Sequence, residues 1–254
     1  DSIAAQFSRE FGPEEIELLN PYFKAGYSAM EKPIESQGTF ISEIAPLGNI
    51  ATEYLDAILQ KDKYRANKLI MEAVEEGTDI KDIYLHVFQK TQWEIGRLWM
   101  LNKVSVADEH FCSSVTQVIM SRLYPFIFGQ NRKHKKFLGC CVPGELHEIG
   151  IRMLTDIFEL EGWDTTYLGA NMPAPALIEC IRTEGIDVLG ISVSIPLHHS
   201  AACSLIEDIH KLDMDTRPKI LVGGQYFLQN PDLWQKIGAD GFTVDAVSAV
   251  GLAT

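Results

Sequence analysis

The chain has 254 residues, 46% of them hydrophobic, so it is long and apolar enough to bury the core of one large or two modest domains. Its formal net charge of -13 argues against direct nucleic-acid binding by this chain, because affinity for phosphate backbones comes mainly from Lys and Arg. No apolar run reaches the ~18 residues that suggest a membrane span, and five cysteines without CxxC spacing fit reduced thiols, so we expect a cytoplasmic protein without a membrane segment.

The first 48 residues are predicted to form a helical extension. One helix is expected over 13–30, interrupted by Pro21, and a stretch with Gly and Pro follows it. A segment of this length cannot supply an independent core. We therefore expect residues 1–48 to pack on the rest of the chain or on a second subunit.

Residues 49–130 contain long amphipathic segments joined by short turns. This pattern predicts an all-α bundle of about four helices. The polar and basic stretch GQNRKHKK, residues 129–136, is the best candidate for a domain boundary.

Residues 135–254 alternate apolar runs with helix-like segments. Parallel strands need helical crossovers and are buried on both faces, so this alternation predicts an α/β domain with a five-stranded parallel sheet, Rossmann-like or flavodoxin-like. The expected strands lie at 136–143, 164–170, 187–194, 219–224 and 241–244.

Three loops at the expected carboxyl ends of these strands have unusual sequences, and ligands of open parallel sheets bind at such loops. They are GELHEIG (144–150), SVSIP (192–196) and GGQY (223–226). None matches GxGxxG or GxxxxGK[ST], so the sequence gives little support for a nicotinamide or nucleoside triphosphate ligand.

His147 in the first loop is a candidate metal ligand. A single loop histidine is usually a surface or packing residue. Glu145 changes this expectation, because a histidine that binds a metal commonly donates its other ring N–H to a carboxylate. Glycines at 144 and 150 would let a large group approach the backbone closely.

Together the three motifs resemble those of cobalamin-binding domains, which carry DxHxxG after strand one, SxL or a relative after strand three and GG after strand four. The resemblance covers residues 136–254 and implies cobalamin as the cofactor, with His147 as the lower axial ligand of cobalt in place of the dimethylbenzimidazole tail. Glu145 replaces the aspartate of the pattern, and its extra methylene would lengthen or re-aim the contact to His147. The residues implied to bind the cofactor here are Glu145, His147, Gly150, Ser192, Ser194, Gly223 and Gly224.

The predicted bundle carries a second set of candidates. Trp99 is followed ten residues later by Glu109 and His110, which resembles the signature of cobalamin-dependent photoreceptors, whose bundle covers the upper face of the corrin. The resemblance implies that Trp99 lies next to a 5'-deoxyadenosyl group and that Glu109 accepts hydrogen bonds from its ribose. The alternative is that Trp99 is a core anchor and that Glu109 and His110 lie on a polar helix face.

Met100 departs from this signature, because light-dependent repressors carry there a histidine that takes the upper cobalt position once the adenosyl group has left. The remaining candidates for such a second ligand are His110, His198 and His199.

These resemblances predict a light sensor in which photolysis of the Co–C bond of a bound alkylcobalamin, adenosylcobalamin or methylcobalamin, changes the conformation of the bundle. The chain itself is then not an enzyme, and its partners would be a second copy, an effector domain or another protein. The alternatives are a corrinoid methyl-carrier protein of a methyltransferase system and a dark-acting cobalamin-responsive regulator.

A bilin is a further cofactor implied by some photoreceptors of this class. Four aromatic residues could wall its pocket, although ordinary packing also explains them: Tyr22, Phe23, Tyr27 and Phe40.

Overall fold

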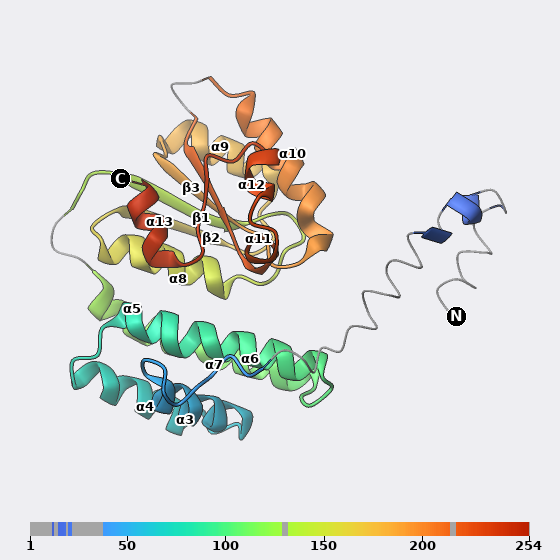
Figure 1. The fold of residues 1–254 in the computed structure, drawn as a ribbon. Coiled ribbons are helices and arrows are strands. Elements are labelled where there is room, and N and C mark those ends of the chain that lie inside the picture. The colour runs from blue at the N-terminus through green and yellow to red at the C-terminus, as the bar shows by residue number, and fades with distance from the viewer. Residues whose placement is uncertain are drawn as a thin grey trace.

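The computed structural model describes residues 12, 15–18, 20–21, 38–128, 132–213 and 217–253. Most of the helix expected over 13–30 lies outside these residues, although 15–18 and 20–21 are helical. A helical half is followed along the chain by an α/β half (Figure 1). Among the described residues, no helix combines the length and apolar character of a membrane span.

The helical half is a bundle, as predicted. Its third helix is continuous from α5 through a π-helical turn, η2, into α6. Local sequence fixes the helix starts, since Asp62 caps α4 and Ser105 forms a capping box with Asp108 at the start of α7. The elements are α3 (Gly48–Leu59), α4 (Lys63–Glu75), α5 (Ile80–Asp82), η2 (Ile83–Phe88), α6 (Gln89–Met100) and α7 (Val106–Ile127).

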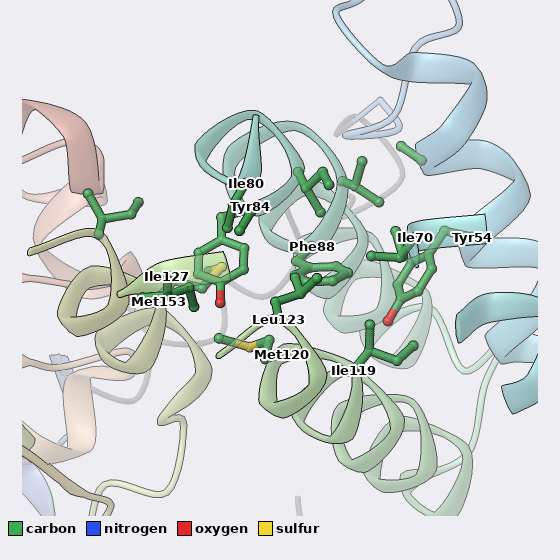
Figure 2. Packing of buried hydrophobic residues seen from close by; sticks show 14 of the residues in the cluster. Tyr54, Ile70, Ile80, Tyr84, Phe88, Ile119, Met120, Leu123, Ile127 and Met153 are labelled. Carbon is green, nitrogen blue, oxygen red and sulfur yellow. The ribbon is translucent and has the colours of Figure 1, made fainter. Parts of the chain in front are cut away.

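The core of the bundle continues into the α/β half. Met153 of the α/β half belongs to the same buried cluster as Tyr84 and Ile127 of the bundle (Figure 2). The Tyr84 hydroxyl also donates a hydrogen bond of 2.8 Å to Oδ2 of Asp156, and both residues are buried. The two halves are therefore joined by a shared buried core that includes a satisfied polar pair.

The α/β half contains a five-stranded sheet in the order β2-β1-β3-β4-β5, and all its neighbours are parallel. This confirms the predicted fold class. Strands are shorter than expected, because the residues after each buried run turn into the loops. The strands are β1 (Lys136–Cys141), β2 (Asp164–Gly169), β3 (Val188–Ser192), β4 (Lys219–Gly223) and β5 (Gly241–Phe242).

Helices cover both faces of the sheet. One face carries α8 and α13 and is turned toward the bundle, whereas α9 and α10 cover the other (Figure 1). Two short helices connect β4 to β5, and Pro231, which has no backbone N–H to donate, lies between them. The helical elements are α8 (Ile149–Leu160), α9 (Ala174–Glu184), η3 (Pro196–His198), α10 (His199–His210), α11 (Gln225–Gln229), α12 (Leu233–Lys236) and α13 (Ala246–Ala253).

Glycines in the two central strands let α8 lie close to the sheet. A Cβ atom at Gly139 would be 2.3 Å from Oγ1 of Thr155 on α8. At Gly190, a Cβ atom would be 2.6 Å from Cζ of Phe137. The chain order reverses between β1 and β3, so the loops after these strands diverge and leave a crevice at the carboxyl edge of the sheet.

Candidate functional site

A cavity of about 1710 Å³ lies between the bundle and the carboxyl edge of the sheet. It exceeds the range of about 300–1,000 Å³ that is usual for small-molecule sites, so it suits a large ligand. Helices α6 and α7 form one side, and α8 and the loops after β1, β3, β4 and β5 form the other. The predicted site residues that line it are Trp99, Glu109, His110, His147, Gly150, Ser192, Ser194, Gly223 and Gly224.

His147 projects into this cavity from the loop after β1. Its side chain is 60% exposed, whereas that of Glu145 beside it is fully buried. The two are joined by a contact of 2.5 Å between Nδ1 of His147 and Oε1 of Glu145. A carboxylate only accepts, so in the neutral ring Nδ1 carries the proton and Nε2 keeps a free lone pair for a metal. The extra methylene of glutamate has therefore not lengthened this contact.

Glu145 is fixed in turn by the backbone around it. Its Oε1 accepts from the N–H of His147 at 3.0 Å, and its Oε2 accepts from the N–H of Ser194 at 2.7 Å. Burial alone would raise the pKa of Glu145, but the hydrogen bonds from the ring and backbone of His147 and from Ser194 outweigh it and lower the pKa to about 2. The hydrogen bond to Glu145 raises the pKa of His147 above its ordinary value.

Glu145→Gln is expected to lower the pKa of His147 toward its ordinary value and to cost about 1–3 kcal/mol of stability, because an amide cannot accept all three hydrogen bonds. The depressed pKa of Glu145 stabilises the fold above the ordinary glutamate pKa of ~4.3, and this contribution is lost as the pH falls toward 2. The raised pKa of His147 stabilises it below ~6.5, and this contribution is lost at higher pH. The loss of stability caused by Glu145→Gln should therefore be largest between pH ~4.3 and pH ~6.5.

The measurements are an NMR titration of the His147 ring and urea unfolding of the cofactor-free protein inside and above that window. Glu109→Gln is the matched control, because the contact of 2.5 Å between Glu109 and His110 is exposed and contributes less. An unchanged titration of His147 in the Glu145→Gln protein would contradict the assignment of the proton to Nδ1.

The loops after β3 and β4 supply the wall of the cavity. Ser192 is buried at the end of β3, and Ser194, two residues farther along, is half-buried. Gly224 has a φ of +99°, and a Cβ atom there would be 2.3 Å from the carbonyl oxygen of Val193. Only glycine therefore fits at 224, whereas a Cβ atom at Gly223 would make an ordinary contact with Thr243 at 3.9 Å.

Trp99 and Glu109 lie on the bundle side of the cavity. Trp99 is 47% exposed near the end of α6, so it is not the buried core anchor that the alternative assumed. Glu109 lies in the first turn of α7, and its Oε1 accepts a hydrogen bond of 2.8 Å from Ser113. The structure thus brings the sequence-predicted residues of the bundle and the sheet to one cavity.

Of the three candidates for a second metal ligand, only His110 lines the cavity. His198 lies against Gly144, and Nε2 of His199 is 3.4 Å from Sγ of Cys203. The exclusion of these two histidines could not be read from the sequence, because η3 and the start of α10 turn them away.

Several residues that line or support the cavity were missed. Trp93 and Glu94 hold Phe40, one of the four aromatic residues proposed for a bilin pocket: Phe40 lines the cavity and packs edge-on against Trp93, and its backbone N–H donates to the buried Glu94. The other aromatic residues proposed for a bilin pocket, Tyr22, Phe23 and Tyr27, lie outside the described residues. Gln117 and Glu148 also line the cavity and contact each other. The only sequence signal for this pair was the place of Glu148 next to His147.

His147 alone could bind a metal only if another molecule supplied most of the ligands of that metal. Within the described ranges, no group of three or more His, Cys, Asp and Glu residues could hold a metal ion. A single imidazole beneath a large cavity instead suits a metal held in a macrocycle. The fold and the site thus define an α/β cofactor-binding protein with a helical cap.

Comparison with known proteins identifies the cofactor. Residues 135–251 match the B12 binding domain family, and residues 50–124 match a second family that is also described as a B12 binding domain. The chain is therefore a cobalamin-binding protein, as the three motifs predicted.

The relatives of this chain include corrinoid proteins. A corrinoid protein of Desulfitobacterium hafniense is 25% identical over 210 residues, 81% of this chain and 96% of the relative. A dimethylamine corrinoid protein of Methanosarcina acetivorans is 27% identical over 126 residues, 49% of this chain and 58% of the relative. The structure of the monomethylamine corrinoid protein of Methanosarcina barkeri shares the fold, with a TM-score of 0.71, 19% identity, and coverage of 82% of this chain and 98% of that one. None of these three is a photoreceptor.

Proposed function

We propose that this chain is a corrinoid carrier that serves a methyltransferase system, which was the alternative at the level of sequence. The support is its similarity to corrinoid proteins along most of its length, together with the exposed imidazole of His147 beneath a cavity of about 1710 Å³. The single observation that carries the proposal is the hydrogen bond of His147 to the buried Glu145, which leaves Nε2 free to bind cobalt. When bound, the cobalamin would supply a cobalt that accepts and gives up a methyl group.

The residues of the chain have separate tasks in this proposal. His147 binds the lower face, and Glu145 holds its ring and its tautomer. Ser192, Ser194 and the Gly223–Gly224 turn line the space for the nucleotide tail, and Gly150 leaves room at the start of α8. Helices α6 and α7 lie over the opposite side, so a methyltransferase partner reaches the cofactor only if the cap moves aside.

A light sensor is the second candidate function. The observation in its favour is that Trp99, Glu109 and His110 all line the cavity on the bundle side. In this function the adenosyl group would contact Trp99 and Glu109, and its loss would change the preferred position of the cap, since a ligand shifts conformations only through differential contacts. The corrinoid relatives support the carrier better.

Loading the protein with methylcobalamin or adenosylcobalamin in darkness separates the two functions. A carrier is expected to lose its methylcobalamin spectrum in the dark when a corrinoid methyltransferase and a thiol or tetrahydrofolate acceptor are added. A sensor is expected to change its hydrodynamic size when the adenosylcobalamin form is illuminated, without any acceptor. Dark protein and free cofactor are the controls. A size change without methyl transfer would overturn the carrier proposal.

Trp99→Ala sharpens this comparison. In a sensor the substitution should change the preference between adenosylcobalamin and methylcobalamin by up to about tenfold. One aromatic contact contributes up to ~1.5 kcal/mol, and this free energy corresponds to about a tenfold change in affinity. In a carrier the preference should stay within about twofold. Competitive titration in the dark, followed by absorption, measures the ratio of the two affinities.

A further inference from the structure

Two carboxylates flank His147 and point to different parts of the molecule. Glu145, two residues before it, is buried in the α/β half and holds the ring. Glu148, the residue after it, lies between the α/β half and the bundle. The corrinoid proposal above gives a task to Glu145 and none to Glu148.

The Glu148 carboxylate connects three elements. Its Oε2 accepts hydrogen bonds from the Tyr167 hydroxyl at 2.9 Å and from the N–H of Ala170 at 3.0 Å, both at the end of β2. Its Oε1 accepts from Nε2 of Gln117 on α7 at 3.2 Å. The residue next to the proposed cobalt ligand is therefore tied both to the sheet and to the helix that covers the cavity.

The contact with Gln117 is the first of three along α8. Glu148, Arg152 and Asp156 are spaced by four residues, so they lie on one face of the helix. Nη2 of Arg152 donates to Oγ of Ser121, and Asp156 accepts from Tyr84. The Asp156 end is buried in the shared core, whereas Glu148 lies about 12 Å away beside the cavity. The contact at Asp156 can therefore stay fixed while the contact between Glu148 and Gln117 opens and closes.

The number of contacts on each side indicates which one yields first. Two donors on the sheet side hold Oε2, whereas a single hydrogen bond of 3.2 Å, from Gln117, holds Oε1 to the bundle. A relative displacement of the two halves therefore breaks the contact to Gln117 before both contacts to the end of β2 are lost. The carboxylate would then stay with β2, and α7 would be released.

We propose that Glu148 is a positioning residue that couples the His147 loop to α7, so that cobalt binding by His147 and closure of the cap over the cavity depend on each other. The inference rests on the proposed role of His147 and adds a route by which the occupied site holds the cap. Because coupling between two equilibria is reciprocal, loss of the contact with Gln117 weakens binding by His147, and loss of binding loosens α7.

Gln117→Met tests the coupling, because it removes the amide while keeping the length of the side chain and leaves the His147 loop untouched. We expect the population of histidine-bound cobalamin, measured from the dark absorption spectrum, to fall about threefold or more. In the cobalamin-loaded variant, trypsin should also cut the segment between α7 and β1, at Arg132 and Lys133, faster than in the loaded original protein. Ser121→Ala is the matched control: it removes the next contact between α7 and α8, which is not attached to the loop, and should leave the population of histidine-bound cobalamin unchanged.

Gln117→Glu is the second variant, since it sets a carboxylate against Glu148 and should act in the same direction with a larger effect. Circular dichroism of each cofactor-free variant checks that it folds. If both Gln117 variants keep the spectrum and the cleavage rate of the original protein, the coupling is wrong. His147→Ala separates this failure from a failure of the proposed function: if it leaves the spectrum unchanged, the ligand assignment itself is wrong.

Discussion

Replacing His147 by alanine is expected to leave the fold intact and to lower the affinity for methylcobalamin at least about tenfold, which corresponds to ~1.4 kcal/mol. The ring is 60% exposed and the backbone N–H of residue 147 still donates to Glu145, so the protein folds, although it loses the part of its stability that the ring contributes below pH ~6.5. The affinity falls because the protein loses the nitrogen that we propose to bind the lower face of the cofactor. Equilibrium titration in the dark, followed by absorption, gives both the affinity and the identity of the lower ligand.

His110→Ala is the matched control for this variant, because His110 also lines the cavity but starts from α7. It should keep the spectrum of the original protein. A second readout is the nitrogen splitting in the electron paramagnetic resonance of the cobalt(II) form with isotopically labelled histidine, which distinguishes a protein ligand from the cofactor's own base. A spectrum that is unaffected by the label and by His147→Ala would show that the lower ligand is not this residue.

Much of the fold could be predicted because the hydrophobic pattern of each segment agrees with its place in the folded protein. Buried runs such as FLGCC and VLGIS alternate with amphipathic helices, and that alternation admits few arrangements other than a parallel sheet. The carboxyl ends of its strands then meet at one edge, which is why motifs about 30 to 80 residues apart could be assigned to one site. Strand ends were predicted too long, because the apolar residues after each strand, such as Val193, are buried in the loops.

The parts of the site that could not be predicted are contacts between segments far apart in the sequence. The contact of Glu148 with Gln117, 31 residues away, depends on how the bundle sits on the α/β half, whereas that of Phe40 with Glu94, 54 residues away, depends on how the segment before α3 packs on α6. No periodicity encodes either placement. Hydrogen bonds between ordinary polar residues also leave no spacing rule in the sequence, unlike a helix cap or a glycine turn.

The sequence also could not separate a sensor from a carrier. Trp99 and Glu109 lie on either side of the turn between α6 and α7, where the bundle faces the cavity. Any residue there would contact the upper side of a bound cofactor, whether the cap serves to hold an adenosyl group or to open for a methyltransferase. The signature therefore locates the residues, and the relatives favour the carrier.

Gly224→Ala is expected to destabilise the cofactor-free protein by about 2–5 kcal/mol. The strain of a positive φ contributes about 1–3 kcal/mol, and the clash of a Cβ atom 2.3 Å from the backbone oxygen of Val193 forces a further displacement of similar cost. Since this backbone is the end of β3, the clash displaces the loop that carries Ser194, whose N–H holds Glu145. Thermal or urea unfolding measures the loss.

Gly223→Ala is the matched partner, because a Cβ atom there would lie 3.9 Å from Thr243 and the backbone needs no positive φ. The variant should keep its stability within about 1 kcal/mol, because alanine is favoured over glycine inside a strand. Its methyl group projects from the cavity wall, so the affinity for cobalamin should nevertheless fall about tenfold or more. We therefore expect that Gly224 is required by the backbone and that Gly223 leaves room for the cofactor. Equal effects of the two substitutions on stability would contradict this expectation.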